Sequence, residues 1–163
     1  MISTTSPQPT AALKTYALAG LGVTLADATD GIVYFGATAG LNPIGVLQYI
    51  ASGLLGNAAF ANAFATTGLV NAAIGLAIHV FLSYGFTAVL FAALSASNAL
   101  RRAWIPTGLV WGALVNLFMT FVALPHSNVA HASLTAVAFF HGIIGHALFV
   151  GLLPAFIIAR KAA

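Results

Sequence analysis

Long apolar stretches, separated by short polar breaks, dominate the chain. A membrane-spanning helix needs roughly 20 consecutive apolar residues. Four stretches reach that length: residues 15–37, 68–94, 104–124 and 134–158. We expect Pro125 to end the third stretch, because the residue before a proline disfavours the helical conformation, and Pro154 to kink the fourth. The pattern predicts an all-α polytopic membrane protein, a bundle of four transmembrane helices.

The uncharged connection between the first two spans, residues 38–67, carries a further helical signal. Asn42 followed by Pro43 is typical of a helix start, with asparagine as the cap and proline in the first turn. Apolar residues then recur at helical spacing, namely Ile44, Leu47, Ile50 and Leu54. This segment is too short to cross a bilayer. It predicts a short interfacial or re-entrant helix between spans 1 and 2.

The remaining segments predict a single domain. Residues 1–14 are polar at first and contain Pro7 and Pro9, which predicts a short disordered N-terminal lead. Residues 15–160 form the transmembrane domain, and residues 161–163 form a tail. Both acidic side chains fall inside a predicted span, and the basic side chains flank the spans.

The composition excludes several classes of protein. Hydrophobic residues make up 61% of the chain and charged residues 4%, whereas a soluble domain carries about a quarter of its residues charged. The lipid bilayer is therefore the expected surrounding. The net charge of +3 comes from few, scattered basic residues, so we expect no nucleic-acid partner. The chain has no cysteine, which excludes disulfides and thiolate metal sites.

The basic residues predict the orientation. Lys14, the Arg101-Arg102 pair and the Arg160-Lys161 pair flank the spans at three places, and four crossings put all three places on one side. Cytoplasmic loops are enriched in lysine and arginine. We therefore expect both termini and the loop after the second span to be cytoplasmic.

Small and polar residues share faces of the spans. Residues that let helix backbones approach closely usually face other helices in a membrane. The second and third spans carry such residues in steps of four, and we expect these faces to turn inward: Asn71, Gly75, His79 and Ser83 on the second, and Gly108, Gly112, Asn116 and Thr120 on the third.

Ionisable and amide side chains form a predicted layer near the middle of the spans. A carboxylate at mid-membrane costs about 2.5–3.5 kcal/mol, so its retention needs a reason. We expect the functional centre to consist first of Asp30, His79 and His146, and second of Asp27, Asn116 and His141. Asp27 and Asp30 are three residues apart on one helix face. One of them should be protonated or paired with a histidine, and we expect Asp30 to contact His79 directly or through water.

Three functions are compatible with this layer. It could be structural, or serve an unidentified membrane complex or homo-oligomer. It could belong to a small proton-coupled transporter or channel. It could also hold a cofactor, with His79 and His146 as ligands of a b-type haem or of a metal ion; we expect none. His126 and His131 of the last loop, with His141, could form a surface metal site, but solvated loop histidines are the expectation. The sequence shows no catalytic constellation, so we expect no enzyme.

Nearly the whole chain after Lys14 resembles a family of uncharacterised four-span inner-membrane proteins from proteobacteria. The resemblance rests on the runs ATDGIVYFGATAGLNPIGVLQYIASGLLGNAAF, GLAIHVFLSYG, FVALPHS and GHALFVGLLPA. The matching positions are Asp30, Pro43, His79, Pro125, His146 and Pro154, whereas Asp27 is not part of the family pattern. The family has no established activity, so the resemblance implies only the architecture and a place in the cell inner membrane. The chain also bears a fainter likeness to the YagU-like inner-membrane proteins.

Overall fold

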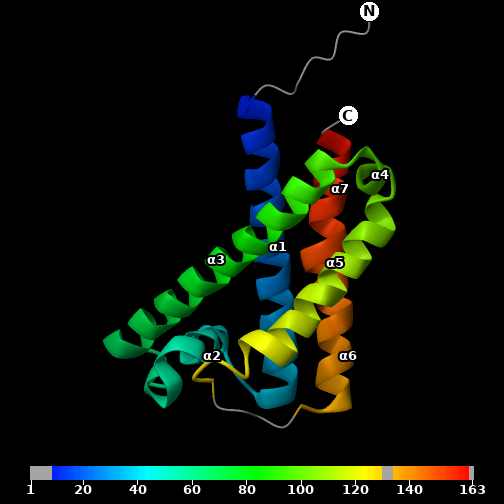
Figure 1. Ribbon diagram of the computed structural model, residues 1–163. Coiled ribbons are helices and arrows are strands. Elements are labelled where there is room, and N and C mark those ends of the chain that lie inside the picture. Colours follow the sequence, from blue (N-terminus) through cyan, green and yellow to red (C-terminus); the bar gives the residue numbers. More distant parts are fainter. Residues whose placement is uncertain (1–8, 130–133, 162–163) are drawn as a thin grey trace, which may run out of the picture.

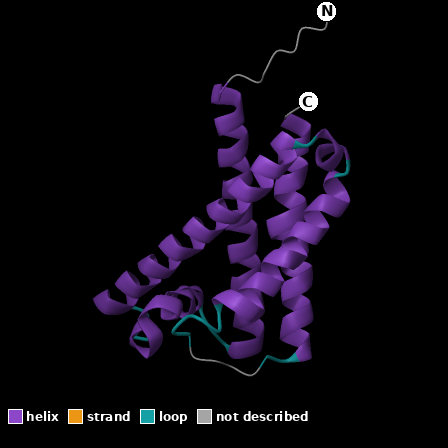
Figure 2. Ribbon diagram, in the orientation of Figure 1, coloured by secondary structure: helices purple, strands orange, loops and turns teal. Residues whose placement is uncertain are grey.

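The computed structural model describes residues 9–129 and 134–161, and these ranges contain helices and loops but no strand (Figures 1 and 2). η1 is a short 3₁₀ helix, and η2 and η3 are wound as π-helices. The elements are α1 (Pro9–Ala39), α2 (Pro43–Leu55), η1 (Gly56–Ala59), α3 (Thr66–Ala96), α4 (Asn98–Arg102), α5 (Trp104–Phe118), η2 (Met119–Ala123), α6 (Ala136–Gly145), η3 (His146–Leu152) and α7 (Leu153–Lys161).

Four helical stretches are long and apolar enough to cross a membrane, as predicted. α1 and α3 are the first two, α5 with η2 is the third, and α6 with η3 and α7 is the fourth. Large apolar side chains face outward along them, for example Phe81 at 76% exposure and Val137 at 71%. Water would not tolerate such an extended apolar surface. The chain is therefore an integral membrane protein with an all-α bundle.

The first span begins earlier than the sequence predicted. α1 starts at Pro9 rather than near Thr15, so residues 9–14 are helical and do not belong to a disordered lead. Proline is well tolerated in a first helical turn, where its missing N–H would have no partner. Residues 1–8 and the last two residues of the predicted tail lie outside the described residues.

The predicted short helix between spans 1 and 2 is α2, with the expected ends. The side chain of Asn42 accepts a hydrogen bond from the Gly45 amide at 2.8 Å, and Pro43 opens the first turn. Gly56 ends the helix with φ 59°, a left-handed value that glycine adopts without strain. α2 lies beside α3 at the end of the bundle away from the chain termini (Figure 1).

Polar side chains and a glycine fasten the α2 region to α3. A Cβ atom on Gly75 would fall on the Leu47 carbonyl, so only glycine allows this approach. Gln48 Nε2 donates to the carbonyls of Ala61 and Gly68, both at 3.2 Å. Asn71 Nδ2 donates to two carbonyls of η1, Ala58 at 3.0 Å and Ala59 at 2.9 Å. These buried and partly buried bonds tie the backbone around η1 to α2 and α3.

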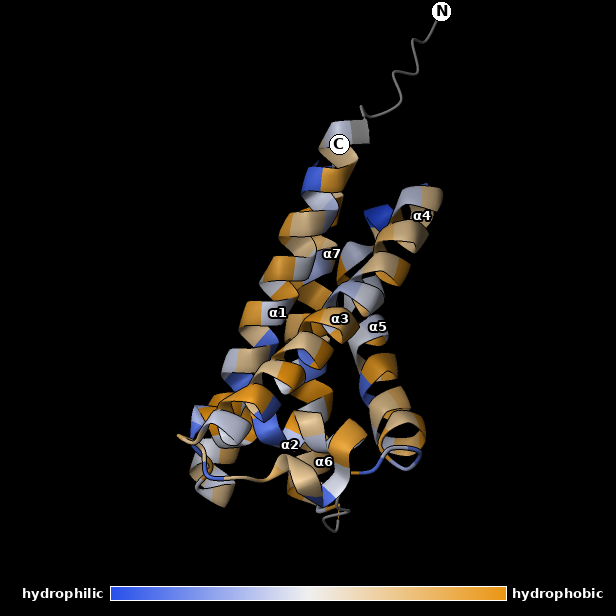
Figure 3. Ribbon diagram, turned by 90° about the vertical axis from the view of Figure 1, so that its left-hand side faces the viewer, coloured by the Kyte–Doolittle hydropathy of each residue, from blue (hydrophilic) through white to orange (hydrophobic). Residues whose placement is uncertain are grey.

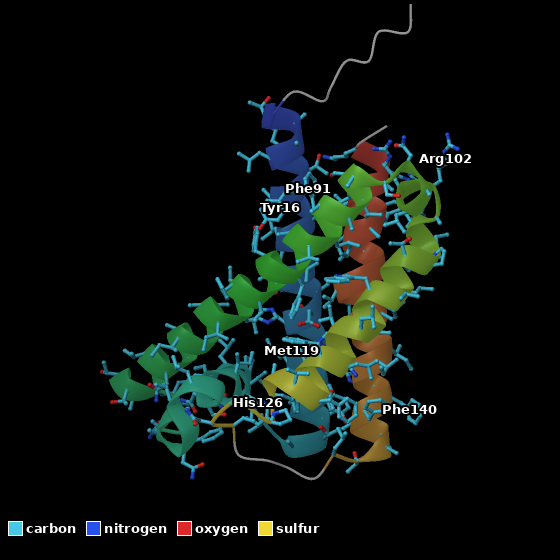
Figure 4. All side chains as sticks on the ribbon, in the orientation of Figure 1. Tyr16, Phe91, Arg102, Met119, His126 and Phe140 are labelled. Atoms are coloured by element: carbon cyan, nitrogen blue, oxygen red, sulfur yellow. The ribbon has the colours of Figure 1, made fainter. Side chains whose placement is uncertain are left out.

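The basic residues gather at one end of the bundle. The start of α1, the end of α7 and the short helix α4 lie together there (Figure 1), and α4 has strongly hydrophilic positions (Figure 3). Arg102 lies at this end and His126 at the opposite one (Figure 4). This arrangement agrees with an even number of crossings and with the predicted clustering of lysine and arginine.

Close backbone contacts hold the third and fourth spans together. A Cβ atom on Gly108 would lie 2.9 Å from the Gly151 carbonyl oxygen, and one on Gly112 would overlap the His146 carbonyl. Apolar side chains fill the remaining core in two clusters: Ala19, Leu90, Leu94, Ala155 and Ile158 nearer the termini, and Val23, Val115 and Val150 beyond them. The faces predicted to turn inward do so, since Asn71, Gly75, His79, Ser83, Gly108, Gly112 and Asn116 are all buried, and Thr120 is half-buried.

Each of the two π-helical segments precedes a proline. In η2 the Leu124 amide bonds to the Met119 carbonyl at 2.9 Å, five residues back, and η3 ends with the same spacing. Pro125 lies two residues after the end of η2, and Pro154 lies two residues after the end of η3. A proline ring clashes with the carbonyl four residues earlier. The wider turn moves that carbonyl aside, and because π segments are common sites of helix kinks, η3 lies where the sequence predicted a kink near Pro154.

Candidate functional site

His79 of α3 reaches across to α1. Its ring is buried, with the residue at 8% exposure. Nε2 lies 3.0 Å from the Thr24 carbonyl oxygen, and Nδ1 lies 3.9 Å from Oδ2 of Asp27. The second distance exceeds a direct hydrogen bond, so Nδ1 and the carboxyl group interact electrostatically. The two contacts fix both ring nitrogens against the same helix.

The Thr24 contact determines which nitrogen of His79 carries hydrogen. A carbonyl oxygen can only accept, so Nε2–H is the donor in every charge state. If His79 is neutral, the Nδ1 lone pair faces Asp27, and only a protonated carboxyl group is compatible with it. If His79 is charged, an ionised Asp27 balances it. The favourable states therefore hold one titratable proton between the two side chains, with no net charge inside the membrane.

A second acid–histidine pair lies beside the first. Asp30 Oδ1 is 3.4 Å from Nε2 of His141, which α6 supplies. The His141 ring stacks on Tyr34 with a centroid distance of 3.8 Å and an interplanar angle of 17°. A Cβ atom on Gly145 would lie only 2.8 Å from Asp30 Oδ2, so the carboxyl group occupies the space that a larger side chain would need. A glycine at 145 thus gives the carboxylate its place between α1 and the fourth span.

The two pairs form a line across three helices. Asp27 and Asp30 are neighbours on α1, separated by about 4.5 Å of helix rise. His79 of α3 is at one end of the line and His141 of α6 is at the other. We call these four side chains the Asp–His line. Side-chain exposure increases along it, from 10% for His79 to 33% for His141.

The structure pairs the predicted residues differently from our expectation. Asp27, not Asp30, lies beside His79, and Asp30 lies beside His141. Asp27 and Asp30 are about 60° apart around the helix, and the two carboxyl groups reach different neighbouring helices. Asp27 and His141, ranked second from the sequence, are thus as central as Asp30 and His79.

His146 and Asn116 lie outside the Asp–His line. His146 Nδ1 is 2.9 Å from the Gly142 carbonyl of its own helix, at the start of η3. Asn116 is 4% exposed and packs its Oδ1 against Gly142. Its Nδ2 has no partner among the described residues, and neither does Nε1 of Trp111 on the same helix. The Asn116 side chain and the His146 backbone carbonyl belong to the contact between the third and fourth spans.

The described residues do not fit the alternative of a haem or metal site at His79 and His146. A haem ligated by His79 and His146 needs a free ring nitrogen on each, but Nε2 of His79 is bonded to Thr24 and Nδ1 faces a carboxyl group. The described parts of the chain also hold no group of three or more His, Cys, Asp or Glu side chains that could bind a metal ion.

The described part of the loop before α6 and the helix α2 each carry one further titratable side chain, His126 and Tyr49. His126 is exposed, and its Nδ1 lies 2.7 Å from the Val122 carbonyl, which agrees with a solvated loop histidine. His131 lies outside the described residues. On α2, burial raises the pKa of the Tyr49 hydroxyl above its usual value of 10.0, so this side chain stays neutral.

An open groove runs along α1 next to Asp30. It has a volume of about 530 Å³, and its walls are α1 residues from Gly22 to Val33 and Phe149 of η3. Its lining is apolar except for Thr29 and Asp30. Thr29 bonds to the Leu25 carbonyl of its own helix at 2.7 Å. The Asp30 carboxyl is therefore the ionisable group at this groove.

Sequence reasoning missed two partners in the site. Tyr34 supports His141 by stacking, and the Thr24 carbonyl receives the His79 hydrogen. Tyr34 lies four residues after Asp30, so helical spacing placed it on the same face. A backbone carbonyl leaves no signal in a sequence.

Comparisons with protein-family models, with curated proteins and with solved structures find no match for this chain. The resemblance to four-span proteobacterial inner-membrane proteins therefore stays a prediction. The structure identifies the chain as an integral membrane protein with four candidate spans. Each of its two acidic side chains lies inside a span and beside a histidine of another helix.

Proposed function

We propose that the protein is a small proton-coupled transporter or channel of the cell inner membrane, and that the Asp–His line binds its protons. One observation carries the proposal: both acidic residues of the chain lie within a span, each beside a histidine of another helix. Ionisable side chains in spans are rare and commonly mark ion pathways. Histidine exchanges protons near physiological pH.

The exposure gradient supports a path for protons. The outer pair, Asp30 and His141, is 27% and 33% exposed, whereas His79 is 10% exposed. α6, which carries His141, begins at the end of the bundle opposite the termini (Figure 1). Protons would therefore enter the line from that end through the more accessible pair and reach His79 through the two carboxyl groups.

A purely structural role is the second candidate. The His79–Thr24 bond and the stacking of His141 on Tyr34 are interactions that also fix helix packing. Hydrogen bonds between spans contribute on average about 0.6 kcal/mol, whereas a central carboxylate costs about 2.5–3.5 kcal/mol. Packing alone does not offset that cost, which favours proton binding over scaffolding.

Proton flux into liposomes tests the proposal. The purified protein is reconstituted, a pH gradient is imposed, and an internal pH-sensitive dye is followed. We expect flux in the wild type and its loss in Asp27→Asn and in Asp30→Asn, because an amide cannot carry the proton. Ser83→Ala is the matched control, since Ser83 is buried one turn from His79 but is not in the line.

Two results would reject the transport role. Flux that persists unchanged in both asparagine variants would show that the carboxyl groups do not carry protons. If the wild type shows no flux and the asparagine variants are only less stable, the line has a structural role or acts within a membrane complex. Crosslinking of the same liposomes reports whether the protein works as a homo-oligomer.

The orientation is a separate part of the proposal. The gathering of basic residues at one end supports cytoplasmic termini under the positive-inside rule. The chain has no cysteine, so single substitutions can be labelled without background. We expect Ala99→Cys of α4 to react with an impermeant thiol reagent only from the cytoplasmic side, and Ala58→Cys of η1 only from the other side. The reverse pattern would invert the topology.

A further inference from the structure

We propose that the groove on α1 binds a membrane-soluble organic cation, such as an amphiphilic quaternary ammonium or phosphonium ion, with Asp30 as its counter-ion. This inference rests on the proposed function and names the class of substrate that the line would exchange for protons. It is carried by the groove and by the position of the carboxyl group in it.

The lining of the groove matches a ligand that is apolar and positively charged. Leu25 and Val33 are 60% and 65% exposed and offer apolar contact toward the lipid side. Phe149 forms the facing wall, and an aromatic ring attracts a cation placed over its face. Ligand sites are mostly apolar with a few placed polar groups, and the lining of this open groove has that composition.

Asp30 supplies the charge that selects a cation. Its side chain is 27% exposed, enough to reach a ligand in the groove. A carboxylate that faces lipid is costly unless a positive group compensates it. An amphiphilic cation reaches the groove from the bilayer and provides both the apolar body and the charge.

A second copy of the chain fits the groove less well. Its lysines and arginines lie at one end of the bundle: Lys14, Arg101, Arg102, Arg160 and Lys161. A parallel or antiparallel neighbour would place these side chains at a membrane surface, whereas Asp30 lies inside its span. A neighbouring copy would therefore cover the apolar walls without compensating the carboxyl group.

Cation binding should displace one proton. Asp30 faces His141 of α6, with Asp27 and Tyr34 on its own helix, and the Asp27 partner His79 comes from α3. An uncharged Asp30–His141 pair holds one exchangeable proton, either on the carboxyl group or, with the carboxylate ionised, as the second ring proton of the imidazole. When a monovalent cation pairs with the Asp30 carboxylate, this proton leaves to water, and the charge of the site is unchanged.

Calorimetry with tetraphenylphosphonium as the probe tests the site. The purified full chain in detergent is titrated in two buffers that differ in ionisation enthalpy, which gives the affinity and the protons released. We expect saturable binding with about one proton released per cation. Asp30→Asn should weaken binding at least about tenfold, equivalent to 1.4 kcal/mol, and abolish the proton release.

A pair of variants separates the groove from the carboxyl group. Ala26→Phe places a ring inside the groove and leaves Asp30 intact, so we expect it to weaken binding about as much as Asp30→Asn. Ala37→Phe adds the same ring to an exposed position of α1 outside the groove and should leave the affinity unchanged. Circular dichroism of each variant reports whether it is folded.

The outcomes distinguish this inference from the proposed function. No saturable binding by the wild type would overturn the cation site, and so would an affinity equal to that of the wild type in the folded Asp30→Asn or Ala26→Phe variant. Proton flux in liposomes would then still stand if it is lost in Asp27→Asn. Binding that depends on Asp30 and releases a proton would support both, whereas a homodimer that excludes the probe would assign the groove to a second copy.

Discussion

The interaction between Asp27 and His79 can be measured by a double-mutant cycle. The single variants Asp27→Asn and His79→Gln each keep side-chain size while removing one partner of the pair. The free energy of unfolding is measured for the wild type, both single variants and the double variant, in mixed micelles of a mild detergent and dodecyl sulfate. The non-additive part is the coupling energy.

The geometry gives the expected size of this coupling. At the observed 3.9 Å, two unit charges attract by about 4 kcal/mol at an effective dielectric constant of about 20. Neutral partners on different spans couple by about 0.6 kcal/mol on average and at most about 1.7 kcal/mol. A coupling above about 2 kcal/mol therefore indicates an ion pair, and a smaller positive value indicates a neutral pair.

A second cycle serves as the control. Asp30→Asn combined with His79→Gln should be additive within about 0.5 kcal/mol, because Asp30 lies beside His141 instead. The reasoning fails if the Asp27 cycle is additive within the same limit. It also fails if the Asp30 cycle shows the larger coupling, since His79 would then pair as the sequence alone predicted.

Three further substitutions test other contacts. Gly75→Ala should destabilise the fold by about 1–3 kcal/mol, because the new methyl group meets the Leu47 carbonyl; the control Gly85→Ala meets nothing within 4 Å and should stabilise α3 by up to about 1 kcal/mol. Asn71→Ala should cost about 1–3 kcal/mol and speed proteolysis of η1, and unchanged cleavage would contradict its anchoring role. Tyr34→Ala should cost at least about 0.5–1.5 kcal/mol, whereas Tyr34→Phe, which keeps the stacked ring, should be neutral in the same unfolding assay.

Hydropathy was sufficient to predict the architecture. The bilayer requires apolar stretches of a set length, so span number and approximate ends follow from the sequence. The Asn42-Pro43 cap and the stop before Pro125 were also readable, because each depends on local backbone chemistry. The start of α1 was misplaced, since the polar composition of residues 9–14 does not prevent a helix from continuing beyond the apolar stretch.

The partners within the site were not readable in the same way. Depth along a span follows from residue number, and it put Asp27, Asp30, His79 and His141 in one layer together with Asn116 and His146, two residues that lie outside the Asp–His line. Pairing depends on how each helix is rotated and which neighbour it faces, and these are tertiary properties. The π-helix η3 changes that rotation within the fourth span, so ideal helical geometry could not predict how the residues after it face their neighbours.

The wide turn of η3 also sets the phase between the two halves of the fourth span. Deleting one residue from it would turn every later residue by about 100° relative to His141 and Gly145. Gly151 would then no longer pack closely against Gly108. The first half of the span, α6 with His141 and Gly145 beside Asp30, would stay in place. The length of this segment in amino acids is thus as constrained as its composition, and single-residue deletions there should be tolerated worse than most substitutions.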